Sequence, residues 1–153
     1  VQDDLLSLIF VSPNFGVRNQ AAALLTLPWA ETLIPLTGKD HSFIPQNEDH
    51  ATYWTTRYPL MALIQMQKIV DWVQESDVGS IHTPSLFIYS DRDESVDSKK
   101  THQIFAKWGT RKSRLAIDRP EGSTHHVIAG DLVAPENTEK VLSAIKAFLD
   151  KMH

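Results

Sequence analysis

Apolar residues follow two kinds of pattern along this chain, short unbroken runs and longer runs at helical spacing. Residues 5–11 and 85–89 are short apolar runs bounded by turn residues, which is typical of strands buried on both faces of a parallel sheet. A shorter run at 114–118 predicts a third strand. From Pro59 to about Glu75, and again from Pro135 onward, apolar residues recur every three or four positions and predict helices.

A further helix is predicted between the second and third strands. Asp97 and Ser98 are both good N-caps for it, and Gly109 suits the position just past its end at Trp108. Residues 14–50 show no sustained period, so short helices and loops are expected there. Strands that alternate with helices predict an α/β fold with a parallel sheet covered on both faces. Three strands make a thin sheet with an open edge at the first strand, so the chain resembles half of such a fold.

Composition narrows the function classes. The 153 residues are 42% hydrophobic and 22% charged, which is the balance of a soluble globular domain. The net charge of −4 and the spread of Lys and Arg argue against a nucleic-acid partner. Without cysteine, the chain has no disulfide, thiolate metal site or Cys nucleophile. No apolar stretch is long enough for a membrane span and no signal peptide is visible, so a cytoplasmic location is expected.

Candidate chemistry follows the second and third predicted strands. Asp91, Asp93 and two further acids come directly after the second strand, and the loop after the third carries His125 and His126. Because the carboxyl ends of parallel strands lie at one edge of a sheet, an acid and a histidine can meet there. A carboxylate that accepts the Nδ1 proton of a histidine leaves Nε2 free to take a proton from a nucleophile. The other acids, Glu94 and Asp97, are expected to favour the start of the next helix.

These two loops resemble motifs of the α/β-hydrolase family. Residues 90–96 (SDRDESV) resemble its acid turn, and residues 123–131 (STHHVIAGD) resemble its histidine loop, particularly in carboxylesterases and monoacylglycerol-lipase-like members. LIFVSPNFG, in the first predicted strand, resembles the strand after the nucleophile elbow. Carried over position by position, Asp93 is the triad acid and His126 the triad base. His125 stands where the family usually has Gly, so His125 stays open as an alternative to His126 for the triad base.

The resemblance implies a fold, a reaction and partners. Residues 1–13 and 76–153 would form the C-terminal half of an α/β-hydrolase core, and 14–75 a mostly helical lid with its connecting helix. The implied function is a serine hydrolase acting on carboxylic esters, without metal or organic cofactor. No G-x-S-x-G is present, so the nucleophile would lie upstream and the isolated chain is expected to be inactive. The missing N-terminal half, or a second copy, would cover the open sheet edge.

The substrate implied by the resemblance is a small ester with an apolar acyl group. Phe43, Trp54 and Tyr58 of the lid are the candidate substrate-binding residues. The same aromatics, with Trp29, would form the binding face of a non-catalytic interaction fragment, which is one alternative interpretation.

Two alternatives involve metals at the acidic loop. Asp91-Arg92-Asp93 after a strand resembles the first motif of haloacid-dehalogenase-like, Mg²⁺-dependent phosphatases, although too few residues separate it from a second acidic motif. An EF-hand fails because Val96 and His102 stand where Gly and a bidentate Glu are needed.

A zinc site formed by His125, His126 and Asp131 is a third metal alternative. It is disfavoured because adjacent histidines on one strand or loop point apart.

Overall fold

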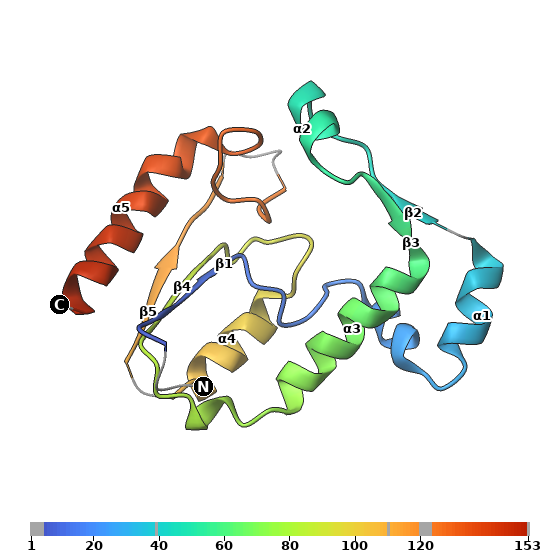
Figure 1. Ribbon diagram of the computed structural model, residues 1–153, viewed down its shortest axis with the longest axis horizontal. Helices are drawn as coiled ribbons and strands as arrows, with labels where there is room; N and C mark the ends of the chain where they lie inside the picture. Colours follow the sequence, from blue (N-terminus) through green and yellow to red (C-terminus); the bar gives the residue numbers. More distant parts are fainter. Residues whose placement is uncertain (1–4, 39, 110, 120–123, 153) are drawn as a thin grey trace.

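A computed structural model describes residues 5–38, 40–109, 111–119 and 124–152 of the protein (Figure 1). Its main sheet has three parallel strands in the order β1–β4–β5. These are β1 (Leu8–Val11), β4 (Ser85–Tyr89) and β5 (Lys112–Ala116). The predicted α/β architecture, a three-stranded parallel sheet with flanking helices, is confirmed.

Helices cover both faces of this sheet. They are α3 (Leu60–Glu75), α4 (Ser98–Lys107) and α5 (Thr138–Leu149), with the short 3₁₀ turns η3 (Val78–Ser80), η4 (Pro135–Asn137) and η5 (Asp150–Met152). In Figure 1, α5 lies on one side of the strands and α4 on the other. The α3 helix ends at Glu75 as predicted and begins at Leu60, one residue later than predicted, because Pro59 is its N-cap. The α4 helix begins after the predicted N-cap Asp97, whose side chain accepts from Lys99 N–H.

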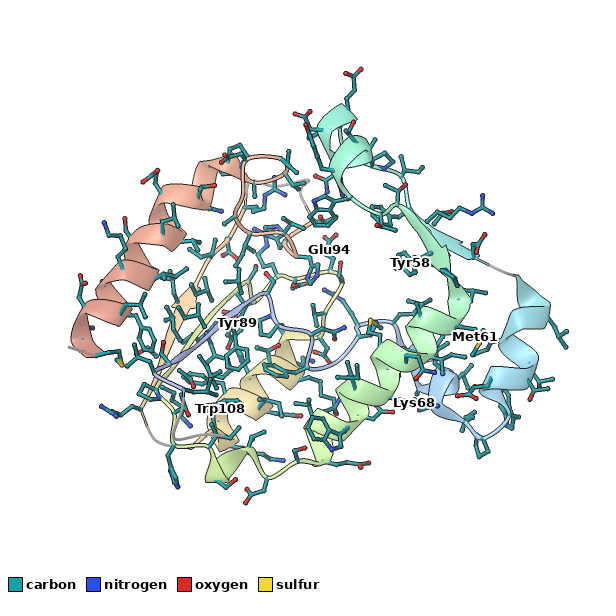
Figure 2. The ribbon with its side chains drawn as sticks, viewed as in Figure 1. Tyr58, Met61, Lys68, Tyr89, Glu94 and Trp108 are labelled. Carbon is teal, nitrogen blue, oxygen red and sulfur yellow. The ribbon has the colours of Figure 1, made fainter. Side chains whose placement is uncertain are left out.

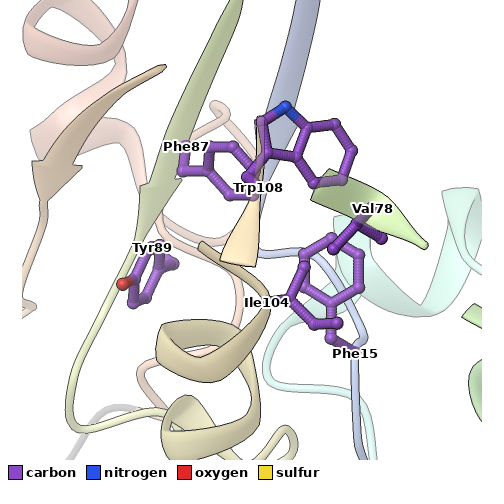
Figure 3. Close-up of a cluster of buried hydrophobic side chains, with 6 residues drawn as sticks. All are labelled: Phe15, Val78, Phe87, Tyr89, Ile104 and Trp108. Atoms are coloured by element: carbon purple, nitrogen blue, oxygen red, sulfur yellow. The ribbon is translucent and has the colours of Figure 1, made fainter. Parts of the chain in front are cut away.

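The central strand β4 divides its side chains between two cores. All five of its residues are buried, because it has a strand on each side and helices above and below. Phe87 and Tyr89 belong to the cluster on the α4 side, with Trp108 (Figure 3). Leu86 and Ile88 belong to the cluster on the α5 side. This alternation is the period-two pattern of a strand with two apolar faces.

The two outer strands differ from the sequence-based expectation. The expectation that the first strand is buried on both faces was wrong: Ile9 is 36% and Val11 46% exposed, and among the described residues only β4 pairs with β1. The strand also begins at Leu8, three residues later than expected. The third strand lies two residues earlier than expected, because its register with β4 places Lys112 opposite Ser85. Ile117 is buried beyond its end.

The segment 14–75 contains more regular structure than predicted. Its elements before α3 are η2 (Gln20–Thr26), α1 (Ala30–Thr37), β2 (Asp40–Ser42), α2 (Glu48–Tyr53) and β3 (Arg57–Pro59). The antiparallel pair β2–β3 was not predicted, since each strand has only three residues. The elements η2, α1 and α3 pack against one another, and Glu31 of α1 forms an ion pair with Lys68 of α3. Figure 2 shows Tyr58, Met61 and Lys68 on this side of the molecule, away from Tyr89 and Trp108 of the core.

Candidate active site

The acid loop, residues 90–97, follows β4 directly and points the side chain of Asp93 into the protein. Asp93 is 4% exposed, and its Oδ1 accepts hydrogen bonds from the backbone N–H groups of Ser95 and Val96, both at 2.8 Å. An aspartate that bonds to the backbone two and three residues ahead is a common way to fix a tight turn. The turn leaves the second oxygen, Oδ2, available to another partner.

That partner is His126. Its Nδ1 lies 2.9 Å from Asp93 Oδ2, and its side chain is 34% exposed while the carboxylate is buried. An ionised carboxylate only accepts hydrogen bonds, so Nδ1 is the protonated nitrogen and Nε2 keeps its lone pair. The pair therefore has one buried end, which fixes the ring, and one end at the surface, which can exchange a proton with a reactant.

The sheet brings these two residues together. β4 and β5 are parallel neighbours, so the loops that follow them leave the same edge. Ser90 joins the loops: its buried Oγ donates to Asp118 Oδ1 at 2.7 Å and accepts from Arg92 N–H at 3.0 Å. Ser90 therefore has a structural use at the position where the family resemblance favours Gly.

His125 has different surroundings from its neighbour. It is 2% exposed, and its Nδ1 accepts a hydrogen bond from Arg119 N–H at 3.2 Å. Of the two adjacent histidines, the structure thus places His126 against Asp93 and places His125 inside the protein. We call residues 124–134 the histidine loop; Ser123, with which the sequence motif begins, lies outside the described residues.

The chain just after β1 also contacts the acid loop, which sequence reasoning missed. Arg18 donates from its guanidinium to Asp93 O at 2.8 Å and from its backbone N–H to Ser95 O at 3.1 Å. Val17 forms an isolated antiparallel bridge with Val96. These long-range contacts hold the turn from outside, and no local sequence pattern indicates them.

The segment 14–75 reaches the histidine loop through the start of α2. Asn47 Nδ2 donates to Leu132 O at 2.7 Å, and Gln46 Nε2 donates to Thr124 Oγ1 at 3.2 Å. The Oδ1 atom of Asn47 also caps α2 by accepting from His50 N–H. One side chain therefore both begins the helix and ties it to the loop that carries His126.

The candidate substrate-binding aromatics lie in two places of this segment. Phe43 and Trp54 contact the buried ring of His50, at centroid distances of 5.6 and 4.6 Å. Tyr58 lies on β3, opposite His41 of β2. A separate cavity of about 230 Å³ lies between η2 and α3. None of the three aromatics lines it.

Asp91, the other acid of the Asp-x-Asp motif, is engaged in an exposed charge network. It forms an ion pair with Arg114 and a 2.8 Å contact with His102 Nε2, while Arg114 also lies over the Tyr89 ring. Burial raises the pKa of Asp91, but the hydrogen bonds and charges of Arg114 and His102 outweigh it and hold that pKa below its ordinary value. Both carboxylates of the Asp-x-Asp motif, on which the phosphatase alternative depends, are thus held by other partners.

Two observations concern metal binding and membrane insertion. Within residues 5–38, 40–109, 111–119 and 124–152, no three His, Cys, Asp or Glu side chains gather closely enough to hold a metal ion. No helix in this described part of the chain is long and apolar enough to cross a bilayer.

Comparison with known proteins identifies the fold. No protein-family model and no curated protein sequence matches the chain. Among solved structures, it is similar to the monoacylglycerol lipase of Paleococcus ferrophilus, with a TM-score of 0.64 and 16% identity over 99% of this chain and 61% of the lipase. It is also similar to a soluble variant of the monoglyceride lipase of Saccharomyces cerevisiae, in complex with a substrate analog, with a TM-score of 0.67 and 13% identity over 99% of this chain and 55% of that one.

These matches show that the chain has the α/β-hydrolase fold, in the part that corresponds to its C-terminal portion. The chain spans 55% and 61% of the length of the two lipases. At 13% and 16% identity the likeness establishes the fold, and the chemistry has to be argued from the site.

Proposed function

We propose that the protein is the acid–base portion of a serine hydrolase that cleaves carboxylic esters through an acyl-enzyme. The observation that carries this proposal is the contact between buried Asp93 and half-exposed His126, through Nδ1, at the carboxyl edge of an α/β-hydrolase sheet. This arrangement supplies two of the three members of a catalytic triad.

In the proposed mechanism, His126 Nε2 takes the proton of a serine hydroxyl as that oxygen attacks the ester carbonyl. It then gives the proton to the departing alkoxide, and the acyl group stays on the serine. Water, activated by the same nitrogen, releases the acid in the second half of the reaction. Asp93 remains ionised throughout, holds the ring in one tautomer and stabilises the imidazolium that forms in each half.

The nucleophile is proposed to come from outside these 153 residues. The sequence has no G-x-S-x-G, the motif that exposes a serine on a sharp turn between strand and helix. In the part of the chain that the structure describes, β1 pairs with β4 alone, and its residues Ile9 and Val11 are exposed. We therefore propose that the N-terminal part of the hydrolase supplies both the serine and the strand that covers this edge; a second copy of the chain is the alternative cover.

The substrate is proposed to be a small ester with an apolar acyl group. In this proposal residues 14–75 form the lid, and Phe43, Trp54 and Tyr58 contact the acyl chain. Support comes from the contacts of Asn47 and Gln46, which tie the beginning of α2 to the histidine loop and so bring Phe43 and Trp54, around His50, toward the site. The two structural neighbours have the names of monoacylglycerol and monoglyceride lipases. The cytoplasmic location expected from the sequence stays a prediction.

Fluorophosphonate labelling tests the proposed function. The probe should form one adduct on a serine of the native polypeptide, upstream of Val1, and none on the 153-residue chain alone. His126→Ala should abolish the adduct, because the serine loses its base, whereas Lys140→Met, an exposed change on α5, should leave it. Absence of any adduct on folded native polypeptide contradicts the serine-hydrolase proposal, and Mg²⁺-dependent phosphate release then becomes the assay of choice.

A further inference from the structure

We infer that Arg119 and His125 are positioning residues that hold His126 against Asp93; this inference rests on the proposed function for its catalytic meaning. Neither residue contacts Asp93 in the described structure. Both act on the histidine loop, one from the end of β5 and the other from the position next to His126.

Arg119 holds both ends of the histidine loop. At the beginning, its backbone N–H donates to His125 Nδ1 at 3.2 Å. At the end, its guanidinium donates from Nε to Glu136 Oε1 at 2.8 Å and from Nη2 to Val133 O at 2.5 Å. The guanidinium is 9% exposed, and the forked geometry of arginine lets it donate to two acceptors at once. The hydrogen bond from Arg119 also keeps the pKa of Glu136 below its ordinary value, so this acceptor stays charged.

The hydrogen bond between Arg119 N–H and His125 also affects the orientation of the neighbouring His126. Its ring is 2% exposed, and Nδ1 must be unprotonated because it accepts a hydrogen bond. A buried side chain with a fixed hydrogen bond fixes its own backbone, and the backbone of residue 125 sets the direction in which His126 leaves the chain. Ile128, 1% exposed in the α5-side core, holds the loop on the far side of His126.

The departure from the family motif now has a physical reason. Where the resemblance favours Gly, this chain has a histidine whose ring is used inside the loop. Removing the ring nitrogen leaves the Arg119 N–H, in a partly buried position, without its partner, and we expect the cost of this unpaired donor to move the loop. The role differs from general stability because its effect falls on the His126–Asp93 hydrogen bond.

Histidine-ring nitrogen NMR on the 153-residue chain tests this inference without any substrate. Wild type should show His126 protonated at Nδ1 and His125 protonated at Nε2. In His125→Leu and in Arg119→Met, the His126 Nδ1 proton should exchange with water about tenfold faster or more, because the hydrogen bond to Asp93 opens more often. His125→Asn should restore slow exchange, since its Oδ1 accepts from Arg119 N–H, and Lys140→Met should match wild type.

Circular dichroism of each variant shows whether the fold is kept. If His125→Leu does not fold, Arg119→Met and His125→Asn decide the question, because the Arg119 variant keeps the backbone donor and the Asn variant keeps the acceptor. Folded His125→Leu and Arg119→Met variants whose His126 exchange stays within about twofold of wild type overturn the inference.

Kinetics on the native polypeptide separate the inference from the proposed function. A positioning role predicts that His125→Leu lowers kcat about tenfold, with KM nearly unchanged, and that His125→Asn recovers it. If no serine is labelled while the NMR results hold, the hydrolase proposal fails and the loop-positioning contact stands. If labelling succeeds and the NMR results fail, only the positioning role is lost.

Discussion

Asp91 and Asp93 stand two residues apart in one loop, and each contacts a histidine, yet their surroundings are opposite. The Asp91 side chain is 50% exposed, pairs with Arg114 and contacts His102 through Nε2. Asp93 is 4% exposed, accepts from two backbone N–H groups and contacts His126 through Nδ1. The same chemical pair, carboxylate and imidazole, thus occurs once with an exposed carboxylate and once with a buried one.

The difference between the two surroundings indicates which carboxylate–histidine pair is suited to proton transfer. The carboxylate of Asp91 already has a permanent cation, Arg114, as its partner, so its charge is balanced in the resting protein. In the described structure, the partners of the Asp93 carboxylate are neutral N–H donors and His126 itself. In the proposed mechanism, its charge is therefore available to the imidazolium that forms on His126 during the reaction, and its burial strengthens that interaction.

The largest expected effect is on turnover of the native polypeptide. Asp93→Asn should lower kcat by about 10³- to 10⁴-fold, because an amide can donate to His126 Nδ1 and favour the tautomer in which Nε2 carries the proton. Asp91→Asn should change kcat by less than about twofold. Steady-state hydrolysis of a short-chain ester measures both.

Equal effects of the two substitutions would contradict the proposed difference in function between Asp91 and Asp93. Near-normal turnover in Asp93→Asn would remove Asp93 from the mechanism. Labelling with a fluorophosphonate reports whether each variant still has a reactive serine. Circular dichroism of the same samples shows that a loss of turnover is not a loss of fold.

The carboxyl edge of the sheet, where Asp93 and His126 lie, could be predicted from the sequence because apolar runs indicate the strands. The run 85–89 defines β4 without error, so Asp91 and Asp93 fall at its carboxyl end by counting alone. The weaker third run misplaced β5 by two residues, since on an edge strand the backbone register with β4 decides the bounds. The small error left the loop after β5, and hence His126, on the correct edge.

Other features depend on contacts that have no local pattern. The burial of His125 follows from the Arg119 N–H, six residues away, and the hold on Asp93 follows from Arg18, seventy-five residues away. The β2–β3 pair has three residues in each strand, which is too short for a period to be visible. In β1 the apolar run matches a strand buried on both faces, but in the described part of the chain β1 is an edge strand, and its Ile9 and Val11 are exposed.

The second expected effect is on the stability of the 153-residue chain. Asp93→Ala should reduce the free energy of unfolding by about 2–4 kcal/mol, because the N–H groups of Ser95 and of buried Val96 lose their acceptor. Asp91→Ala should cost less than about 1 kcal/mol, as is usual for an exposed ion pair. Urea unfolding at pH 7 measures both values.

An Asp93→Asn control separates the two roles of Asp93, since its Oδ1 can still accept from both N–H groups. It should recover most of the stability and none of the turnover. A loss in Asp91→Ala as large as that in Asp93→Ala would show that burial does not distinguish the two acids.

The smallest expected effect concerns pH and comes from Asp91. Its pKa in the folded protein lies below the ordinary value of 3.8, so its interaction with Arg114 stabilises the fold above about pH 4 and is lost as the pH falls through the folded pKa. Arg114→Gln should therefore lower the free energy of unfolding by less than about 1 kcal/mol at pH 6, and the gap to wild type should shrink below pH 4 and in high salt. Urea unfolding from pH 6 down to pH 3, with and without added salt, measures this gap. A gap that stays constant over that range would mean that Arg114 stabilises the protein by packing on Tyr89, where its guanidinium lies 4.7 Å from the ring centre, and not through its charge pair with Asp91.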